Sequence, residues 1–147
     1  MSEQLENSRP DLRLRKLLSA NDVGATGSHQ AGVFVPPDMI RFFPALREGS
    51  LNPDAWIDVE DDAGNAWIWR FLHYNNGIVS TGTRNEYRLT HTTQALRQLG
   101  ARAGDELEMK RIEDRLYRVR LIAPHPSSKV LILSTSGPWR AVSVRVS

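Results

Sequence analysis

Side chains that can read DNA bases lie close together in the segment STGTRNEYRLT, which spans residues 80–90. Arg84 can chelate guanine O6 and N7, Asn85 can pair with adenine, and Glu86 can accept a hydrogen bond from cytosine N4. Arg88 supplies a second guanidinium four residues after the first. A loop with all three chemistries could read several base pairs in a major groove. The same composition also fits a solvated loop between strands, held by internal ion pairs.

A second polar segment, LSANDVGATGSHQAG, spans residues 18–32 and directly precedes the apolar residues VFVPP. A simple connection between strands rarely needs so many different donors and acceptors, so this segment is a candidate binding loop. The basic run RPDLRLRK (residues 9–16) comes just before it, whereas DVEDDAG (residues 58–64) is acidic. One face could therefore be positive although the formal net charge is only +2.

Arginine dominates the basic residues: of the 19 lysines and arginines only Lys16, Lys110 and Lys129 are lysines. The planar guanidinium suits phosphates and guanine edges. The codon bias of a high-GC genome would give the same excess, so composition leaves both explanations open.

Length and composition predict one domain, residues 1–147, because 147 residues with 40% hydrophobic content can bury one core. The absence of cysteine excludes disulfides and thiolate metal sites. No apolar run approaches the roughly 20 residues of a membrane helix, and the N-terminus lacks a signal-peptide core. These features predict a soluble protein of the cytoplasm.

Alternation and turn signals predict a mainly β (α+β) fold with about seven strands, two short helices and a closed or nearly closed sheet. The helices are expected at residues 38–47 and 93–105, with Gly100 as C-cap of the second. Strands are expected in residues 12–18, 31–37, 55–61, 66–74, the tail of 75–90, a hairpin over 106–122, and 129–147.

The string SANDVGATGSHQ, the FFP at residues 42–44 and TRNEYRLT at residues 83–90 resemble the N-terminal effector domain of EcoRII-type restriction endonucleases. The resemblance runs from about Lys16 to Thr90. It implies a DNA-binding pseudobarrel, a fold also found in plant B-three transcription-factor domains. Two arms of that fold grip the major groove like a wrench. Residues 18–32 are then the N-arm and residues 80–90 the C-arm.

The resemblance assigns DNA contacts to specific side chains of both arms. Arg84 and Arg88 would read guanines and Glu86 a cytosine amino group. Tyr87 and Gly82 stand where the family has lysines that help to hold DNA, and Tyr87 could stack or contact a thymine methyl instead. The predicted DNA-binding residues are Arg13, Arg15 and Lys16 for phosphates, Ser19, Asn21, Asp22, His29 and Gln30 in the N-arm, and Arg84, Asn85, Glu86, Tyr87 and Arg88 in the C-arm.

By the same resemblance, the chain is a non-catalytic targeting domain and the N-terminal part of a longer, Type IIE-like restriction endonuclease. Its expected target is CCWGG, where W is A or T, or a related short site in double-stranded DNA. We expect it to bind one site as a monomer in a prokaryotic cytoplasm. It should need no cofactor and no metal, because Mg²⁺ would serve a nuclease domain outside this chain.

Three alternatives remain open on the sequence. The first is a free-standing DNA-binding regulator with the same fold. The second is a small nuclease that uses Glu108 and Lys110, which have the E-x-K spacing of nuclease metal sites, with Asp54 as a distant second carboxylate. The third is a barrel whose arms bind acidic protein or glycan ligands. His73, His91 and His125 show no metal-ligand spacing, and no catalytic residue is predicted.

Overall fold

The structure, a computed structural model, describes residues 11–24, 32–122 and 130–144. No helix in these ranges is long and apolar enough to cross a membrane. The strands are β1 (Asp11–Leu17), β2 (Val33–Val35), β3 (Asp54–Glu60), β4 (Ala66–Tyr74), β5 (Glu86–Thr90), β6 (Glu106–Glu113), β7 (Leu116–Ile122), β8 (Val130–Ser136) and β9 (Trp139–Val144). The helices are η1 (Pro37–Phe42), α2 (Asn76–Val79) and α3 (Thr93–Gln98).

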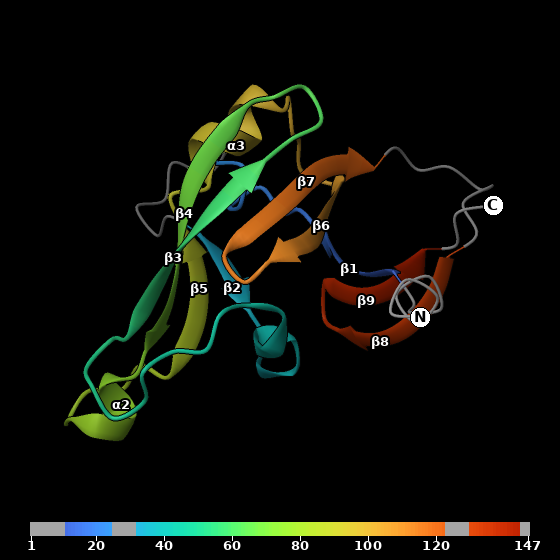
Figure 1. The fold of residues 1–147 in the computed structure, drawn as a ribbon. Coiled ribbons are helices and arrows are strands. Elements are labelled where there is room, and N and C mark those ends of the chain that lie inside the picture. The colour runs from blue at the N-terminus through green and yellow to red at the C-terminus, as the bar shows by residue number, and fades with distance from the viewer. Residues whose placement is uncertain (1–10, 25–31, 123–129, 145–147) are drawn as a thin grey trace.

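All nine strands belong to one sheet in the order β2-β5-β4-β3-β7-β6-β1-β9-β8. Every pair of neighbours is antiparallel except β3 and β7, which run parallel. The sheet curls into an incomplete barrel, with α2 at one end of the molecule and β8 and β9 on the opposite side (Figure 1). The predicted mainly β fold is therefore confirmed.

The predicted counts of about seven strands and two helices were too low for the described residues. The three-residue β2 and the edge strand β8 each pair with one neighbour and complete the sheet. The helix expected over residues 38–47 is a 3-10 helix that ends at Phe42, because a residue that precedes proline, here Phe43 before Pro44, favours extended backbone. The unpredicted helix is α2, four residues long.

A side-chain hydrogen bond, instead of a strand ladder, links β2, one edge of the curled sheet, to β9, the strand next to the other edge. The indole Nε1 of Trp139, on β9, donates a hydrogen bond of 2.9 Å to the carbonyl oxygen of Phe34, on β2. Trp139 is fully buried, with 1% of its surface exposed. This bond fixes β2, the strand that follows the N-arm, against the far side of the barrel.

An aromatic cluster fills the concave side of the sheet. The ring of Phe43, just after η1, lies 4.8 Å from Phe71, 5.8 Å from Tyr117 and 6.4 Å from Trp139, measured between centroids. The Tyr117 hydroxyl donates a hydrogen bond of 2.7 Å to the carbonyl oxygen of Phe42. The segment containing η1 thus packs inside the curled sheet, where Phe43 contacts side chains of β4, β7 and β9.

A buried carboxylate holds β1, β6 and β7 together. Glu108 accepts hydrogen bonds from Arg13 at 2.6 Å, Arg15 at 2.8 Å and Arg120 at 2.9 Å. Burial acts to raise the pKa of Glu108, but the hydrogen bonds from the three arginines outweigh it and hold the pKa below its usual value. Glu108 is therefore ionised, and its negative charge compensates part of the positive charge of Arg13, Arg15 and Arg120.

The first prediction concerns this carboxylate. Glu108→Gln should lower the free energy of unfolding by about 3 kcal/mol, because it leaves the buried guanidinium of Arg15 without its counter-charge. Since folding lowers the pKa of Glu108, its contribution is present at neutral pH and is lost as the pH falls through the lowered value. The difference between wild type and variant should therefore shrink in acid. Urea unfolding at several pH values measures both effects.

Glu113→Gln is the matched control, because Glu113 lies exposed on the same strand. It should change the free energy of unfolding by no more than about 0.5 kcal/mol. Equal unfolding curves for the two variants would show that the Glu108 cluster does not stabilise the sheet.

Candidate nucleic-acid interface

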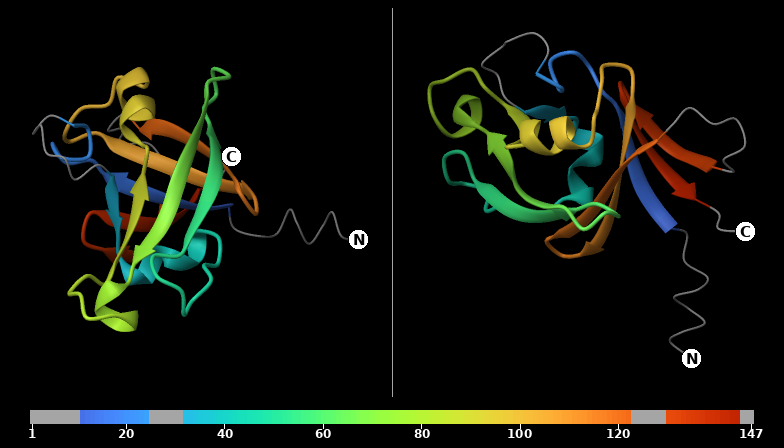
Figure 2. Two further views of the ribbon diagram at one scale, coloured as in Figure 1. Left: turned by 90° about the vertical axis from the view of Figure 1, so that its left-hand side faces the viewer. Right: turned by 90° about the horizontal axis from the view of Figure 1, so that it is seen from above.

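The two arms leave opposite ends of one pair of strands. β2 follows the N-arm directly, and β5 forms the end of the C-arm. These strands are antiparallel, with Val33 opposite Leu89 and Val35 opposite Tyr87. The length of β5 therefore separates the end of the N-arm, beside Leu89, from the loop of the C-arm, residues 80–85, by roughly 14 Å at the usual rise of a strand. In both views of Figure 2, the loop after β1 and the loop around α2 lie on the same side of the molecule.

The described part of the N-arm, residues 18–24, is a turn held by Asp22. The Asp22 carboxylate accepts a hydrogen bond of 2.9 Å from the backbone N–H of Ser19, and the Ser19 hydroxyl accepts one of 3.1 Å from the N–H of Asp22. Asp22 also forms a buried ion pair with Lys16. The exposed residues of this turn are Ser19, Ala20 and Gly24, and Asn21 is half-buried. The predicted contacts His29 and Gln30 lie outside the described residues.

Gly32 fixes where the N-arm rejoins the sheet. Its φ is +112°, and a Cβ at this position would lie 2.4 Å from the carbonyl oxygen of Leu89. Only glycine permits both the backbone angle and this close approach. The N-arm therefore ends directly against β5, the strand that carries the C-arm.

The loop of the C-arm is folded onto Asn76. The Asn76 side-chain oxygen accepts a hydrogen bond of 2.7 Å from the backbone N–H of Arg84, and the Arg84 carbonyl accepts one of 2.7 Å from Gly77. A Cβ at Gly82 would lie 2.4 Å from Asn76 Cγ. A lysine at position 82, as the family resemblance implies, would displace the Asn76 side chain that positions Arg84.

Arg84, Glu86 and Arg88 form one charged cluster at the base of this loop. Arg84 lies over the ring of Tyr74, 3.7 Å from its centroid, and donates to Glu86 Oε1 at 2.5 and 3.0 Å. Arg88 Nε lies 3.4 Å from Glu86 Oε2. Burial acts to raise the pKa of Glu86, but both arginines together lower it. The carboxylate is therefore a charged acceptor, and the cluster keeps one excess positive charge.

The other two predicted C-arm contacts lie against His73. Asn85 Oδ1 is 2.8 Å from His73 Nε2. The ring of Tyr87 stacks on the His73 ring, with centroids 3.9 Å apart and planes 12° apart. Burial and then the negative charge of Glu48 raise the pKa of Tyr87, so its hydroxyl keeps its proton. One face of the Tyr87 ring is therefore covered by His73. The predicted contact of Tyr87 with a base stays a prediction.

The three residues predicted to hold phosphates are paired inside the protein. Arg13 and Arg15 bind Glu108, and Lys16 binds Asp22. Arg15 and Lys16 are only 4% and 5% exposed. A phosphate contact from either side chain would require its ion pair to open, so Arg13, at the margin of the cluster, is the best placed of the three.

The E-x-K pair does not form a metal site in the part of the chain that is described. Glu108 is surrounded by three guanidinium groups, which occupy its oxygens and repel a cation. The proposed second carboxylate, Asp54, pairs with Arg70 at 2.6 Å. No three histidines or carboxylates within residues 11–24, 32–122 and 130–144 lie close enough to hold a metal ion. These contacts disfavour the nuclease alternative.

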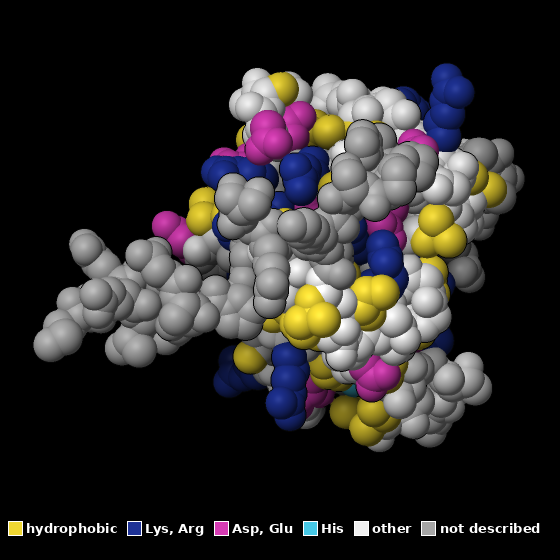
Figure 3. Space-filling model, turned by 90° about the vertical axis from the view of Figure 1, so that its right-hand side faces the viewer, with side chains coloured by type: hydrophobic (Ala, Val, Ile, Leu, Met, Phe, Trp, Pro, Cys, Tyr) yellow, Lys and Arg dark blue, Asp and Glu magenta, His cyan; other side chains and the backbone are white. Residues whose placement is uncertain are grey.

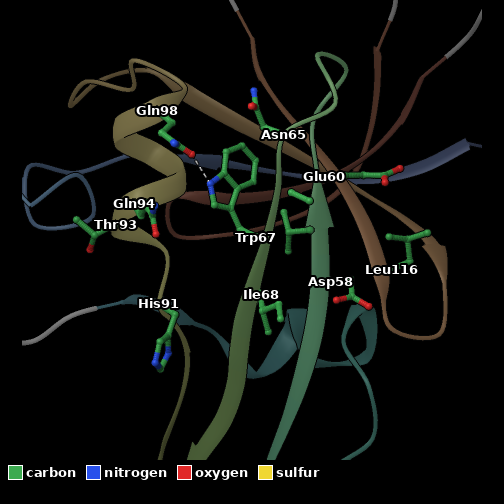
Figure 4. A pocket seen from close by; sticks show the side chains of 12 residues that line it. Asp58, Glu60, Asn65, Trp67, Ile68, His91, Thr93, Gln94, Gln98 and Leu116 are labelled. Carbon is green, nitrogen blue, oxygen red and sulfur yellow. Dashed lines mark hydrogen bonds between the residues drawn. The ribbon is translucent and has the colours of Figure 1, made fainter.

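A groove of about 1020 Å³ lies between α3 and the β3–β4 hairpin (Figure 4). Trp67 Nε1 donates a hydrogen bond of 2.5 Å to Gln98 across it. The charged side chains that line it, Asp58 and Glu60, are both acidic, and His91 lies at its lower end in the same view. Acidic walls repel a phosphate backbone, so this groove is a poorer candidate for nucleic acid than the arms.

The side of the molecule formed by β8 and β9 exposes more hydrophobic side chains than the C-arm does. Hydrophobic side chains lie between charged ones on this face (Figure 3). The edge strand β8 contributes Leu131, Ile132 and Leu133, which are 59%, 51% and 49% exposed. On the neighbouring strand β9, Arg140 forms an ion pair of 2.7 Å with Glu106 of β6.

Sequence reasoning missed the residues that position the C-arm. Tyr74, His73 and Asn76 hold Arg84 and Asn85 through ring contacts and hydrogen bonds. The turn signal Asn75-Asn76-Gly77 could have indicated a structured loop, because asparagine side chains often bond to nearby backbone in turns. Nothing local marks His73, whose contacts come from a neighbouring strand.

Comparison with known proteins identifies a family whose members resemble this chain in sequence. Residues 11–103 match the family described as "Restriction endonuclease EcoRII, N-terminal". The chain is 34% identical over 89 residues to the Type II restriction enzyme EcoRII of Escherichia coli, over 54% of this chain and 20% of that protein. The matched part thus spans about a fifth of the length of that relative. The family match covers both arms and ends before β6.

Two solved structures share the fold at low sequence identity. The Arabidopsis FUS3–DNA complex has a TM-score of 0.55 and 19% identity, over 76% of this chain and 96% of that one. A hypothetical Arabidopsis thaliana protein has a TM-score of 0.51 and 15% identity, over 76% and 89% of the two chains. The predicted pseudobarrel is confirmed by these neighbours. Because the family match covers more than half of the sequence, the chain belongs to the family of EcoRII N-terminal domains.

Proposed function

We propose that this chain is a DNA-binding effector domain of an EcoRII-like restriction enzyme and that it recognises a short duplex sequence with its N-arm and C-arm. The observation that carries the proposal is the cluster of Arg84, Glu86 and Arg88 at the base of an exposed loop. Membership of the EcoRII N-terminal family supports it, since the matched residues include both arms.

The chemistry of the cluster suits G·C base pairs. In the major groove, guanine presents the acceptors O6 and N7 and its cytosine partner presents the N4 donor. Two guanidiniums and one ionised carboxylate supply the complementary groups. In the free protein Arg84 donates to Glu86, so binding exchanges these internal bonds for bonds to bases. The target CCWGG, or a related site rich in G·C pairs, is consistent with this set of groups.

The spacing of the arms suits one groove. The separation of roughly 14 Å along β5 is close to the width of a B-DNA major groove, about 12 Å. One chain can then place the C-arm on bases from one side and Ser19, Asn21, His29 and Gln30 of the N-arm from the other. We therefore propose a monomer on one site, with Arg13 at the phosphates.

In the proposed context this chain targets an enzyme and does not cut DNA itself. Catalysis belongs to a separate nuclease domain, which would use Mg²⁺, as in a Type IIE-like restriction system of a bacterial cytoplasm. A free-standing regulator is the second candidate, and the fold shared with a plant protein solved on DNA favours it. Both candidates require sequence-specific binding, and a nuclease reading frame continuous with this chain would decide between them.

The second prediction separates base reading from general attraction to DNA. Arg84→Ala should weaken binding to the preferred duplex by about 1–3 kcal/mol and change binding to random duplex little, because a guanine contact is sequence-specific. Selection from random duplexes followed by competition titration at one salt concentration measures both affinities. Arg97→Ala, an exposed arginine on α3, is the control and should change neither. An equal loss on every duplex would exclude base reading by Arg84.

The third prediction concerns cytosine methylation. If Glu86 accepts from cytosine N4, its carboxylate lies near the neighbouring C5 edge, where a methyl group adds bulk and displaces water. Methylation of the inner cytosine of the site should weaken binding by at least about 1 kcal/mol. Matched methylated and unmethylated duplexes, titrated at one salt concentration, give the difference. Equal affinities would place Glu86 away from that edge.

A further inference from the structure

We propose that Asn85 reads DNA only as a hydrogen-bond donor, because His73 holds its amide with the oxygen inward and the nitrogen outward. Asn85 then selects a base with major-groove acceptors, guanine above all, and does not make the paired contact by which asparagine recognises adenine. This assignment makes His73 a positioning residue for specificity. It rests on the proposed function, since it names what one residue of the C-arm reads.

The contact that orients Asn85 comes from a rigid, buried ring. His73 Nε2 lies 2.8 Å from Asn85 Oδ1, and His73 is only 3% exposed. Its ring is covered by Tyr87 at 3.9 Å, and its backbone N–H donates to the carbonyl of Pro53 at 3.0 Å. The stacked Tyr87 ring and the burial of His73 restrict rotation of the imidazole, and the backbone bond holds the strand that carries it.

The proton in this contact can come only from the histidine. An amide oxygen carries no hydrogen, so Nε2 must donate to Asn85 Oδ1. The other ring nitrogen, Nδ1, makes no hydrogen bond within the described residues, and the carboxylate of Glu48 lies 3.6 Å from it. Both the neutral Nε2–H tautomer and the imidazolium donate from Nε2. The neutral Nδ1–H tautomer cannot make this bond, so the contact with Oδ1 requires a proton on Nε2.

The outward group of Asn85 has two donors and no partner. Asn85 is exposed, and its amide nitrogen makes no hydrogen bond to any described residue. Recognition of adenine by asparagine uses the amide oxygen for N6 and the nitrogen for N7 at once. With the oxygen directed toward a buried ring, only the donors reach the groove. Guanine offers them two acceptors, whereas adenine offers N7 beside a competing donor.

The test compares base preferences of the full chain and three variants by selection from random duplexes. Wild type should prefer guanine over adenine at one position by about tenfold. Asn85→Asp keeps an oxygen on His73 but turns the outward donor into an acceptor, so the preference there should move to cytosine, with about a tenfold loss on the original site. His73→Gln keeps a donor and should keep the guanine preference. His73→Leu frees the amide, and guanine and adenine should bind almost equally.

A second measurement tests the hydrogen bond without DNA. In ¹H–¹⁵N spectra of the free chain, the Nε2–H proton of His73 should be protected from exchange, and Asn85→Ala should remove that protection. Absence of the protected proton in wild type would overturn the assignment even if His73→Leu folds too poorly to titrate. Asn85→Asp keeps an oxygen on His73 Nε2 at an exposed position, so this variant should melt within about 2 °C of wild type.

The outcomes separate this inference from the proposed function. A wild type that selects a defined sequence, with an Asn85→Asp variant that selects the same sequence at every position, would overturn the role of Asn85 and leave the DNA-binding function intact. Uniform weakening of all sequences by Asn85→Asp would also overturn it. A wild type that selects no sequence would refute the proposed function, and the inference with it.

Discussion

The packing of aromatic rings around Phe43 is the constraint on which the other features of this domain depend. Phe71, Tyr117 and Trp139 lie on strands β4, β7 and β9, and they meet only if the sheet curls around the segment that contains η1. Buried aromatic side chains carry large apolar areas, and each favourable ring pair adds about 0.5–1.5 kcal/mol. The curl also brings Trp139 to the carbonyl of Phe34, which fixes β2 and the N-arm that precedes it.

Arginines of this domain form ion-pair clusters in two different settings, one buried within the sheet and one at an exposed loop. Arg15, with Arg13 and Arg120, surrounds one buried carboxylate and stabilises three strands. Arg84 and Arg88 instead share one carboxylate at the base of an exposed loop, where the excess charge is available to a ligand. The same pairing chemistry therefore serves the fold in one place and supports the proposed recognition in the other. The difference lies in burial, because the Glu108 side chain is 2% exposed and that of Glu86 is 24% exposed.

Local patterns predicted much of the fold. The strands expected in residues 55–61 and 66–74 correspond to β3 and β4, and Gly100, with a φ of +74°, follows α3 as expected of a C-cap. The parallel pairing of β3 with β7 was not predictable in this way, because it joins residues far apart in sequence. The helix predicted over residues 38–47 ends at Phe42, and Phe43-Pro44 in the sequence already favours an end at this point.

The candidate site was predictable only in part. The base-reading types of the C-arm are contiguous in sequence, whereas the burial of Arg15 and Lys16 depends on which face of β1 packs inward and on the partners Glu108 and Asp22. The support from His73 to Asn85 likewise crosses between strands. The predicted contacts of the C-arm lie together in the structure and their role in binding stays a prediction, whereas the side chains that orient them were not predicted.

In the proposed complex, both arms of one chain contact one duplex. A titration of ¹⁵N-labelled chain with one short duplex that contains CCWGG, followed through backbone amide shifts, measures this most directly. We expect the largest shifts in residues 18–24 and 80–88, saturating at one chain per duplex. Shifts confined to the groove lined by Trp67 and Gln98, or to β8, would contradict this arrangement.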